Sequence, residues 1–203
     1  MSQLAGRDVS RETQQRLTIF ADLLAKWNPK INLVARGTMD QVWTRHIADS
    51  AQVFDLAPRN ARSWADLGSG GGFPGLVVAI LAAEESPHVK VTLVESDGRK
   101  AVFLRTVLRE TGVDAKVETA RIERLDPLNA DVISARALAP LKDLLGYVDR
   151  HAAPNAIAVL PKGASWQKEV DIATKSWTFT HQIHRSETDP SAVILTVGDL
   201  SHV

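Results

Sequence analysis

Cysteine is absent from this sequence of 203 residues. This excludes disulfide bonds, thiolate metal sites and every mechanism with a cysteine nucleophile. The sequence also lacks an uninterrupted run of about 18 apolar residues, the length that a membrane-spanning helix needs. Residues 1–16 are polar, without the apolar core of a secretory signal. These absences predict a cytoplasmic protein that binds neither a membrane nor a metal.

An excess of positive charge is missing as well, because 24 Lys and Arg residues balance 24 Asp and Glu residues. Proteins that bind nucleic acid nonspecifically usually carry a basic excess. Any contact with nucleic acid must therefore use a local basic patch.

Helical periodicity marks the first part of the chain. Apolar residues recur there at steps of three and four, at Leu17, Phe20, Leu24 and Trp27. We expect this helix to end at Asn28-Pro29, because the residue before a proline disfavours the α region. The capping-box spacing of Thr38 and Gln41 predicts a second helix from Thr38. A connector at residues 57–63 sets off a predicted helical N-terminal appendage, residues 1–60.

Strands and helices alternate after the connector, which predicts a parallel, doubly wound α/β sheet over residues 61–203. The predicted strands are residues 63–67, 89–95, 116–119, 131–135, 157–160, 178–183 and 192–197. Asp97 and Gly112 have the residue types that cap the two ends of one intervening helix. No helix separates the last two strands, so we expect them to form an antiparallel hairpin.

A glycine-rich segment, DLGSGGGFPG at residues 66–75, follows the first predicted strand and precedes a helix. At that place in an open α/β sheet the backbone approaches a ligand closely. Two patterns fit the segment. The dinucleotide pattern G-x-G-x-x-G uses Gly70, Gly72 and Gly75. The pattern acid-x-Gly-x-Gly-x-Gly looks like the first motif of S-adenosylmethionine (SAM)-dependent methyltransferases, and it uses Asp66, Gly68, Gly70 and Gly72.

Glu95 ends the second predicted strand, where a carboxylate can accept hydrogen bonds from ribose hydroxyls. This feature does not discriminate, since both NAD and SAM carry a ribose. The terminal antiparallel pair does favour SAM, because it resembles the end of the seven-stranded methyltransferase sheet. A nicotinamide oxidoreductase and a SAM-binding RNA module without turnover remain as alternatives.

Two kinds of methyl transfer are disfavoured by missing residues. Methylation at C5 of a pyrimidine commonly uses a cysteine, and methylation of an exocyclic adenine amine usually goes with an Asn/Asp-Pro-Pro-aromatic turn. Residues 134–137 read Ser-Ala-Arg-Ala at that place instead. The acceptor that remains is one that is already nucleophilic, such as guanine N7, which needs alignment and no general base.

An ordered set of motifs now points to one family. The motifs are WNPKINL (27–33), RHIADS (45–50), DLGSGGGFPGL (66–76), LVESDGRKAVFLR (93–105), ARIE (120–123), DVISARALAPL (131–141) and PKG (161–163). With them the chain resembles the glucose-inhibited division protein B family, the bacterial 16S rRNA guanine-N7 methyltransferases. It departs from the family's pattern at residues 33–36, 77–78 and 124.

The resemblance implies a Rossmann-like class I SAM-dependent methyltransferase fold with seven strands. It also implies methyl transfer from SAM to N7 of a guanine (position 527) in the 530 loop of 16S rRNA, which leaves S-adenosylhomocysteine. The substrate would be 16S rRNA or the 30S ribosomal particle, and the protein a monomer. SAM-dependent methylation of another RNA or of a small acceptor is the alternative.

Candidate site residues follow from the motifs and from the resemblance. The predicted cofactor-binding residues are Asp66, Gly68, Gly70, Gly72, Phe73, Glu95, Ile122, Glu123 and Arg136. Arg136 is also the predicted catalytic residue, because it ends the fourth strand beside the reaction site. The predicted RNA-binding patch consists of Arg36, Arg45, Arg99, Lys100 and Lys162. For His46 we expect a hydrogen bond between a helix and the core.

Overall fold

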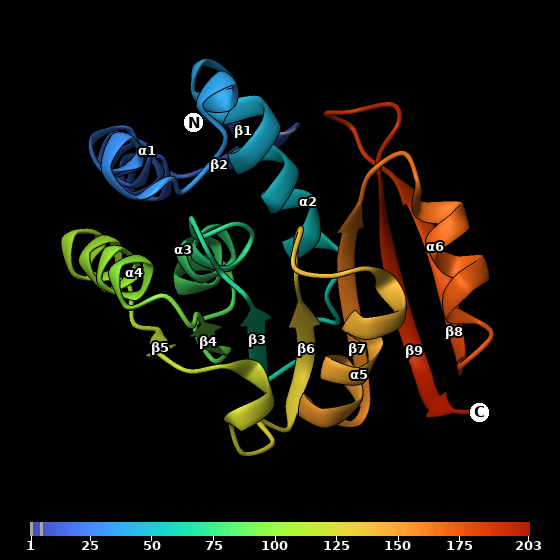
Figure 1. Cartoon of the computed structure of the whole chain (residues 1–203). Helices are drawn as coiled ribbons and strands as arrows, with labels where there is room; N and C mark the ends of the chain where they lie inside the picture. Colours follow the sequence, from blue (N-terminus) through green and yellow to red (C-terminus); the bar gives the residue numbers. More distant parts are fainter. Residues whose placement is uncertain (1, 5) are drawn as a thin grey trace.

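A single seven-stranded sheet organises the chain (Figure 1). The computed structural model describes residues 2–4 and 6–203, and of residues 2, 3 and 36 the backbone alone. The strand order is β5-β4-β3-β6-β7-β9-β8. These strands are β3 (Ser63–Leu67), β4 (Lys90–Val94), β5 (Lys116–Glu118), β6 (Ala130–Ser134), β7 (Ala152–Lys162), β8 (Trp177–Arg185) and β9 (Val193–His202).

The first five strands of the sheet pair in parallel, and β9 pairs antiparallel with both β7 and β8. This confirms the predicted parallel sheet with an antiparallel C-terminal hairpin. β4 and β6 flank β3 on opposite sides. Chain order therefore reverses at β3, and such a switch point leaves a crevice at the carboxyl ends of the strands.

Helices cover both faces of the sheet. They are α1 (Arg11–Ile31), α2 (Asp49–Asp55), α3 (Gly75–Glu85), α4 (Gly98–Thr111), α5 (Leu141–His151) and α6 (Trp166–Ala173). Alternate residues of β3 point to opposite faces, so Trp64 joins the buried cluster under α1, α3 and α4, whereas Ala65 joins the cluster under α5 and α6. No helix within the described residues combines the length and the apolar character needed to cross a membrane.

The α4 helix forms where the sequence predicted it. The Asp97 carboxylate accepts hydrogen bonds from the backbone N–H groups of Arg99 and Lys100, and so satisfies two donors at the helix N-terminus. Gly112 ends the helix in the left-handed region, at φ +65°. Both capping residues are therefore confirmed.

The prediction that α1 ends at Asn28-Pro29 is wrong, because the helix continues to Ile31. Proline removes one backbone donor, and near the end of a helix this loss is tolerated. The Asn28 side chain stabilises the exit, since its Oδ1 accepts hydrogen bonds from the N–H groups of Leu33 and Val34 at 2.8 and 2.9 Å.

The second predicted helix is also different from expectation. A 3-10 helix, η1 (Arg36–Gln41), and a π-helix, η2 (Val42–Ala48), precede the short α2. Thr38 therefore lies inside η1 and does not cap an α-helix. Its hydroxyl donates to the Ala35 carbonyl at 2.8 Å and lies 2.8 Å from Nε2 of His46. A short hairpin of β1 (Ser2–Leu4) and β2 (Arg7–Val9) was not predicted.

The N-terminal helices share a core with the sheet. Phe20 of α1 packs on Phe73 of the glycine segment, with ring centroids 5.0 Å apart, and Trp27 packs on Phe103 of α4 at 5.7 Å. Leu17 and Leu24 are fully buried in the same cluster. This packing fixes the N-terminal segment beside the glycine segment, and the division into an appendage (residues 1–60) and a sheet domain remains a prediction.

Candidate active site

A cavity of about 480 Å³ opens at the carboxyl edge of the sheet, at the switch point. Apart from Leu33, which follows α1, its lining comes from the ends of β3, β4, β5 and β6 and the segments that follow them. Of the predicted cofactor-binding residues, seven line it: Gly68, Gly70, Phe73, Glu95, Ile122, Glu123 and Arg136. Residues from four strand ends therefore meet around one space, as the predicted cofactor site requires.

Glu95 holds the glycine segment in place. One carboxylate oxygen accepts a hydrogen bond from the Gly70 N–H at 2.8 Å, and the other accepts from the Asp97 N–H at 2.7 Å. Gly70 has a φ of +52°, a conformation that side chains disfavour. Each carboxylate oxygen has a second lone pair, so Glu95 can fix the loop and still accept a bond from a ribose hydroxyl.

Asp66 lies behind the glycine segment and does not line the cavity. Its side chain is buried, with 1% of the residue exposed. One oxygen accepts a hydrogen bond from the Gly75 N–H at 3.2 Å, and the other accepts from the Ser134 hydroxyl at 2.7 Å. Ser134 in turn accepts from the Trp64 indole N–H at 2.9 Å. Asp66 thus orients the loop from the protein side.

Burial raises the pKa of Asp66 to about 6, although its hydrogen bonds and the positive charge of Arg136 oppose the rise.

Gly72, the other predicted cofactor residue outside the lining, has a packing role. Its φ is +91°, and a Cβ atom there would come within 2.9 Å of Cγ of Leu76. The side chain of Leu76 therefore requires glycine at this position.

Arg136 lies at the centre of the site. Its guanidinium carbon is 5.0 Å from the Phe73 ring centroid, within the range of a cation–π contact. Its Nη1 is 3.7 Å from a carboxylate oxygen of Asp49, an acid at the start of α2. The side chain is 20% exposed and lines the cavity. Arg136 thus forms an ion pair with Asp49 and lines the cavity, and its place at the reaction site remains a prediction.

His46 stacks on the ring of Phe73, with centroids 5.0 Å apart and an interplanar angle of 29°. Its Nε2 lies 2.8 Å from the Thr38 hydroxyl of the neighbouring η1, so this hydrogen bond joins two N-terminal segments and does not reach the core as expected. Burial, together with the nearby positive charges of Arg136 and Arg45, lowers the pKa of His46 to about 4. The imidazole is therefore neutral at pH 7.

Residues after β5 form the far wall of the cavity. Ile122 is mostly buried in the 3-10 helix η3 (Ile122–Arg124), and its carbonyl lies 3.0 Å from a ring nitrogen of His151. Glu123 accepts a hydrogen bond from the Tyr147 hydroxyl at 2.9 Å. Sequence reasoning missed Tyr147, which also lines the cavity. Nothing local marks it, because it reaches the site from α5.

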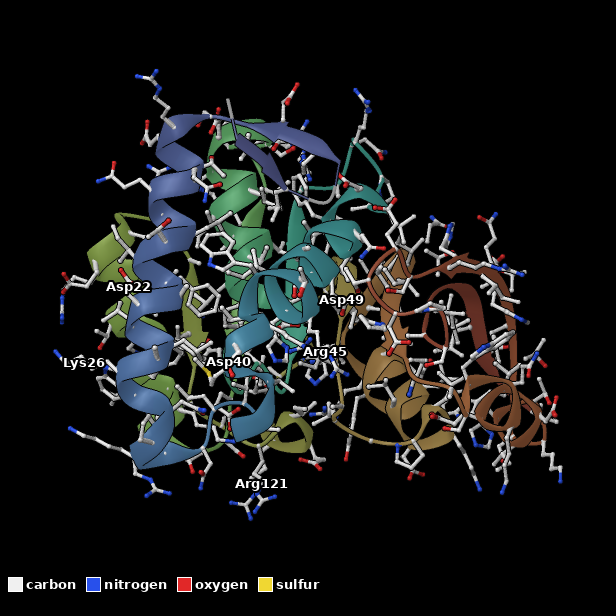
Figure 2. All side chains as sticks on the ribbon, turned by 90° about the horizontal axis from the view of Figure 1, so that it is seen from above. Asp22, Lys26, Asp40, Arg45, Asp49 and Arg121 are labelled. Carbon is white, nitrogen blue, oxygen red and sulfur yellow. The ribbon has the colours of Figure 1, made fainter. Side chains whose placement is uncertain are left out.

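The predicted RNA-binding residues differ in their exposure and in their distance from the cavity. Arg45 is exposed on η2, and Arg99 is exposed near Asp97, at 3.6 Å. Lys100 lines the cavity. The side chain of Arg36 lies outside the described part of the structure. Figure 2 shows Arg45 between α1 and the C-terminal strands, on the same segment as Asp49.

Lys162 is enclosed, at 9% exposed. Its ammonium group is 2.9 Å from a carboxylate oxygen of Glu169 and donates to the Ala139 carbonyl at 3.2 Å. Glu169 also accepts from the Leu141 N–H, so the pair ties β7 to α5 and α6. This internal pairing gives Lys162 a structural role, and its contact with RNA remains a prediction.

The buried carboxylate of Asp66 predicts a pH dependence of stability. In the unfolded chain the pKa is 3.8, and in the folded protein it is about 6. The folded state therefore holds the proton more tightly, and the free energy of unfolding should fall as pH rises from about 4 to 7, by about 3 kcal/mol from this group. Asp66→Asn should remove that slope in urea unfolding measured across this range.

Asp131→Asn is the matched control. Hydrogen bonds from the backbone N–H of Arg62 and from Ser63 lower the pKa of Asp131, so it titrates below 3.8 and should leave the slope above pH 4 unchanged. An unaltered slope in Asp66→Asn would show that Asp66 is ionised throughout this range.

Comparison with known proteins identifies the family of this chain. The family model for rRNA small subunit methyltransferase G (GidB) matches residues 13–191. A ribosomal RNA small subunit methyltransferase G from Ruegeria sp. (strain TM1040) is 56% identical over 196 residues, which cover 97% of this chain and 95% of that protein.

Solved structures share the fold at low identity. A methyltransferase from Geobacter sulfurreducens has a TM-score of 0.62 at 14% identity, over 95% of this chain and 98% of its own. The M. jannaschii TYW2 protein, crystallised with AdoMet, has a TM-score of 0.57 at 10% identity, over 86% of this chain and 80% of its own. The fold is that of the class I SAM-dependent methyltransferases. By the family match and the 56% identity, the chain belongs to the rRNA small subunit methyltransferase G family.

Proposed function

We propose that this protein transfers a methyl group from SAM to N7 of a guanine in 16S small-subunit rRNA and releases S-adenosylhomocysteine. The observation that carries the proposal is the cavity at the switch point, where the glycine segment, Glu95 and Arg136 converge in a chain of this family. The particular guanine, position 527 in the 530 loop, rests on the resemblance of the motifs. We also propose that the protein acts as a monomer in the cytoplasm.

The residues of the cavity fit SAM. Gly68 and Gly70 present backbone where a bulky ligand must come close, and the Glu95 carboxylate can accept bonds from the ribose. Ile122, Glu123 and Arg136 line the cavity. We expect the first two to flank the adenine and the Arg136 guanidinium to pair with the carboxylate of the methionine part. When bound, SAM supplies an electrophilic methyl group on a sulfonium.

The chemistry at guanine N7 makes few demands on the protein. N7 carries a free lone pair at pH 7, so no proton has to be removed before the methyl group is transferred. The base gains the positive charge that the sulfonium loses, so the charge of the site is conserved. Asp66 is shut away from the cavity and His46 is neutral, and neither is needed as a base. Catalysis then comes from alignment, in which Arg136 and Phe73 hold the reactants.

The test of this function is single-turnover methyl transfer from labelled SAM to 16S rRNA and to 30S particles, with the product mapped by mass spectrometry. We expect 7-methylguanosine at one position in the 530 loop. The rate should be flat from about pH 6.5 to 8.5, because the lowered pKa of His46, about 4, lies below this range. Arg136→Lys should slow transfer by a similar factor at every pH, since the loss is geometric.

A methyl group at another atom of the RNA, or none at all, would contradict the function. A rate that rises steeply with pH at saturating RNA would keep the function but reveal a general base, and the mechanism without a base would then be wrong.

Gly70→Val tests the cofactor site. The side chain would enter the cavity, and we expect the Kd for SAM to rise by at least about tenfold. Gly112→Val is the matched control, because Gly112 also has a positive φ and open space for a Cβ atom, but lies at the end of α4 outside the cavity lining. Both variants should lose about 1–2 kcal/mol of stability from backbone strain. Calorimetric titration that gave the same Kd for both variants would contradict this placement.

Arg45→Ala tests the RNA-binding patch. We expect weaker binding to rRNA, a salt dependence whose logarithmic slope is lower by about 1, and an unchanged Kd for SAM. Arg109→Ala is the matched control, because Arg109 is equally basic and exposed but pairs with Glu110 in the last turn of α4. Filter binding at several salt concentrations measures the affinity for rRNA. Equal losses of affinity in both variants would show that Arg45 does not belong to the RNA-binding patch.

A further inference from the structure

A second cavity, of about 250 Å³, lies next to the proposed SAM cavity. Three residues of the β6–α5 segment, Arg136, Ala137 and Ala139, line both. The second cavity continues past this segment to Asp49 and to the start of β9. The two spaces are therefore neighbours that share one wall, as the proposed transfer reaction needs for a cofactor and an acceptor base.

Apolar and polar groups are separated in this second cavity. Pro161, Ala192 and Val193 offer apolar surface against which a flat ring can pack. Two carboxylates also belong to it, those of Asp49 and Glu169. Glu169 is already satisfied by the Lys162 ammonium and the Leu141 N–H, as described above. Asp49 is the acid that faces the cation shared with the SAM cavity.

Asp49 is held firmly but keeps acceptor capacity. Its Oδ1 accepts hydrogen bonds from the hydroxyls of Ser186 and Thr188, at 3.2 and 3.0 Å. Its Oδ2 faces Nη1 of Arg136 at 3.7 Å, beyond hydrogen-bond distance. The Asp49 side chain is 16% exposed, so the carboxylate is fixed in direction and largely shielded from water. A fixed, shielded carboxylate binds neutral N–H donors well.

The order of these groups matches the edge of a guanine. Around its rim guanine presents the N7 lone pair, the O6 acceptor and then the N1–H and N2–H donors. From the SAM cavity outward the protein presents the transferable methyl group when SAM is bound, then the Arg136 donor, then the Asp49 acceptor. Adenine would place its N6 amine against Arg136 and its N1 acceptor against Asp49, so both contacts would be mismatched.

We propose that the second cavity receives the target guanine, flipped out of the RNA stack, and that Asp49 selects guanine by accepting hydrogen bonds from N1–H and N2–H. Arg136 donates to O6 at the boundary between the two cavities. Extrusion of a base into a pocket that reads its Watson–Crick edge is a general solution for enzymes that modify bases. This inference rests on the proposed function and adds to it the residue that determines specificity.

The test compares 530-loop RNA that carries guanosine at the target position with the same RNA carrying inosine, which lacks only the N2 amine. For the wild-type protein we expect kcat/KM to fall about tenfold or more with inosine, because one hydrogen bond to Asp49 is lost. In Asp49→Ala we expect lower activity on guanosine and nearly equal values for the two RNAs. Dividing the guanosine-to-inosine ratio of each variant by that of the wild type cancels the intrinsic difference in N7 reactivity between the two bases.

Asp40→Asn is the matched control, because Asp40 is an exposed acid on η1 and lies outside both cavity linings. It should discriminate against inosine as the wild type does. Asp49→Asn serves if Asp49→Ala fails to fold, and it should also lose discrimination, since an amide cannot accept two hydrogen bonds with the same geometry. Ser186→Ala, which removes a support of Asp49 and keeps the carboxylate, should retain discrimination.

The outcomes distinguish the proposed methyl transfer from the proposed selection of guanine by Asp49. If an Asp49 variant is less active but still discriminates fully, Asp49 only holds Arg136 in place and the inference is wrong. If the wild type methylates guanosine and inosine RNA equally, the inference is wrong and the proposed function stands. If the wild type methylates neither, although it binds SAM, the proposed function fails and the inference fails with it.

Discussion

One buried carboxylate connects the parts on which the site depends. Asp66 is the penultimate residue of β3; it accepts a hydrogen bond from the backbone where α3 begins and another from Ser134 at the end of β6. The loop between β3 and α3 contains three glycines with positive φ and would otherwise have many conformations. The Asp66 bonds and the Glu95 bond to Gly70 restrict it from both sides. Burial of this carboxylate is unfavourable, as the raised pKa of Asp66 indicates, so its role is to hold the loop in place rather than to add stability.

The N-terminal segment contributes to the site and does not merely cover the sheet. Phe20 of α1 and His46 of η2 both pack on Phe73, and Arg136 lies over the same ring. Asp49, one turn beyond His46, forms an ion pair with the Arg136 guanidinium at 3.7 Å. The segment therefore determines the direction in which Arg136 points, and it supplies Asp49, the acid that forms an ion pair with this cation.

The π-helix η2 explains how these contacts are possible. Inserting residues into a helical segment as a π-turn rotates the side chains that follow it, and π-turns are frequent at functional sites. Here η2 leads directly into α2, so that His46 can reach Phe73 while Asp49 reaches Arg136. A regular α-helix from Thr38, as the capping-box spacing predicts, would give these side chains different directions.

The sequence by itself determined the sheet, its antiparallel C-terminal hairpin, the caps of α4 and the residues of the glycine segment. Each of these depends on local periodicity, on glycine or on capping chemistry, which neighbouring residues report. Only the tertiary structure decided that Asp66 lies behind the loop, that Lys162 is paired with Glu169 and that Tyr147 reaches the cavity from α5. The ion pair of Asp49 with Arg136 joins residues 87 positions apart (136 − 49). Contacts of this kind arise from packing of whole elements, and no local pattern of residues encodes them.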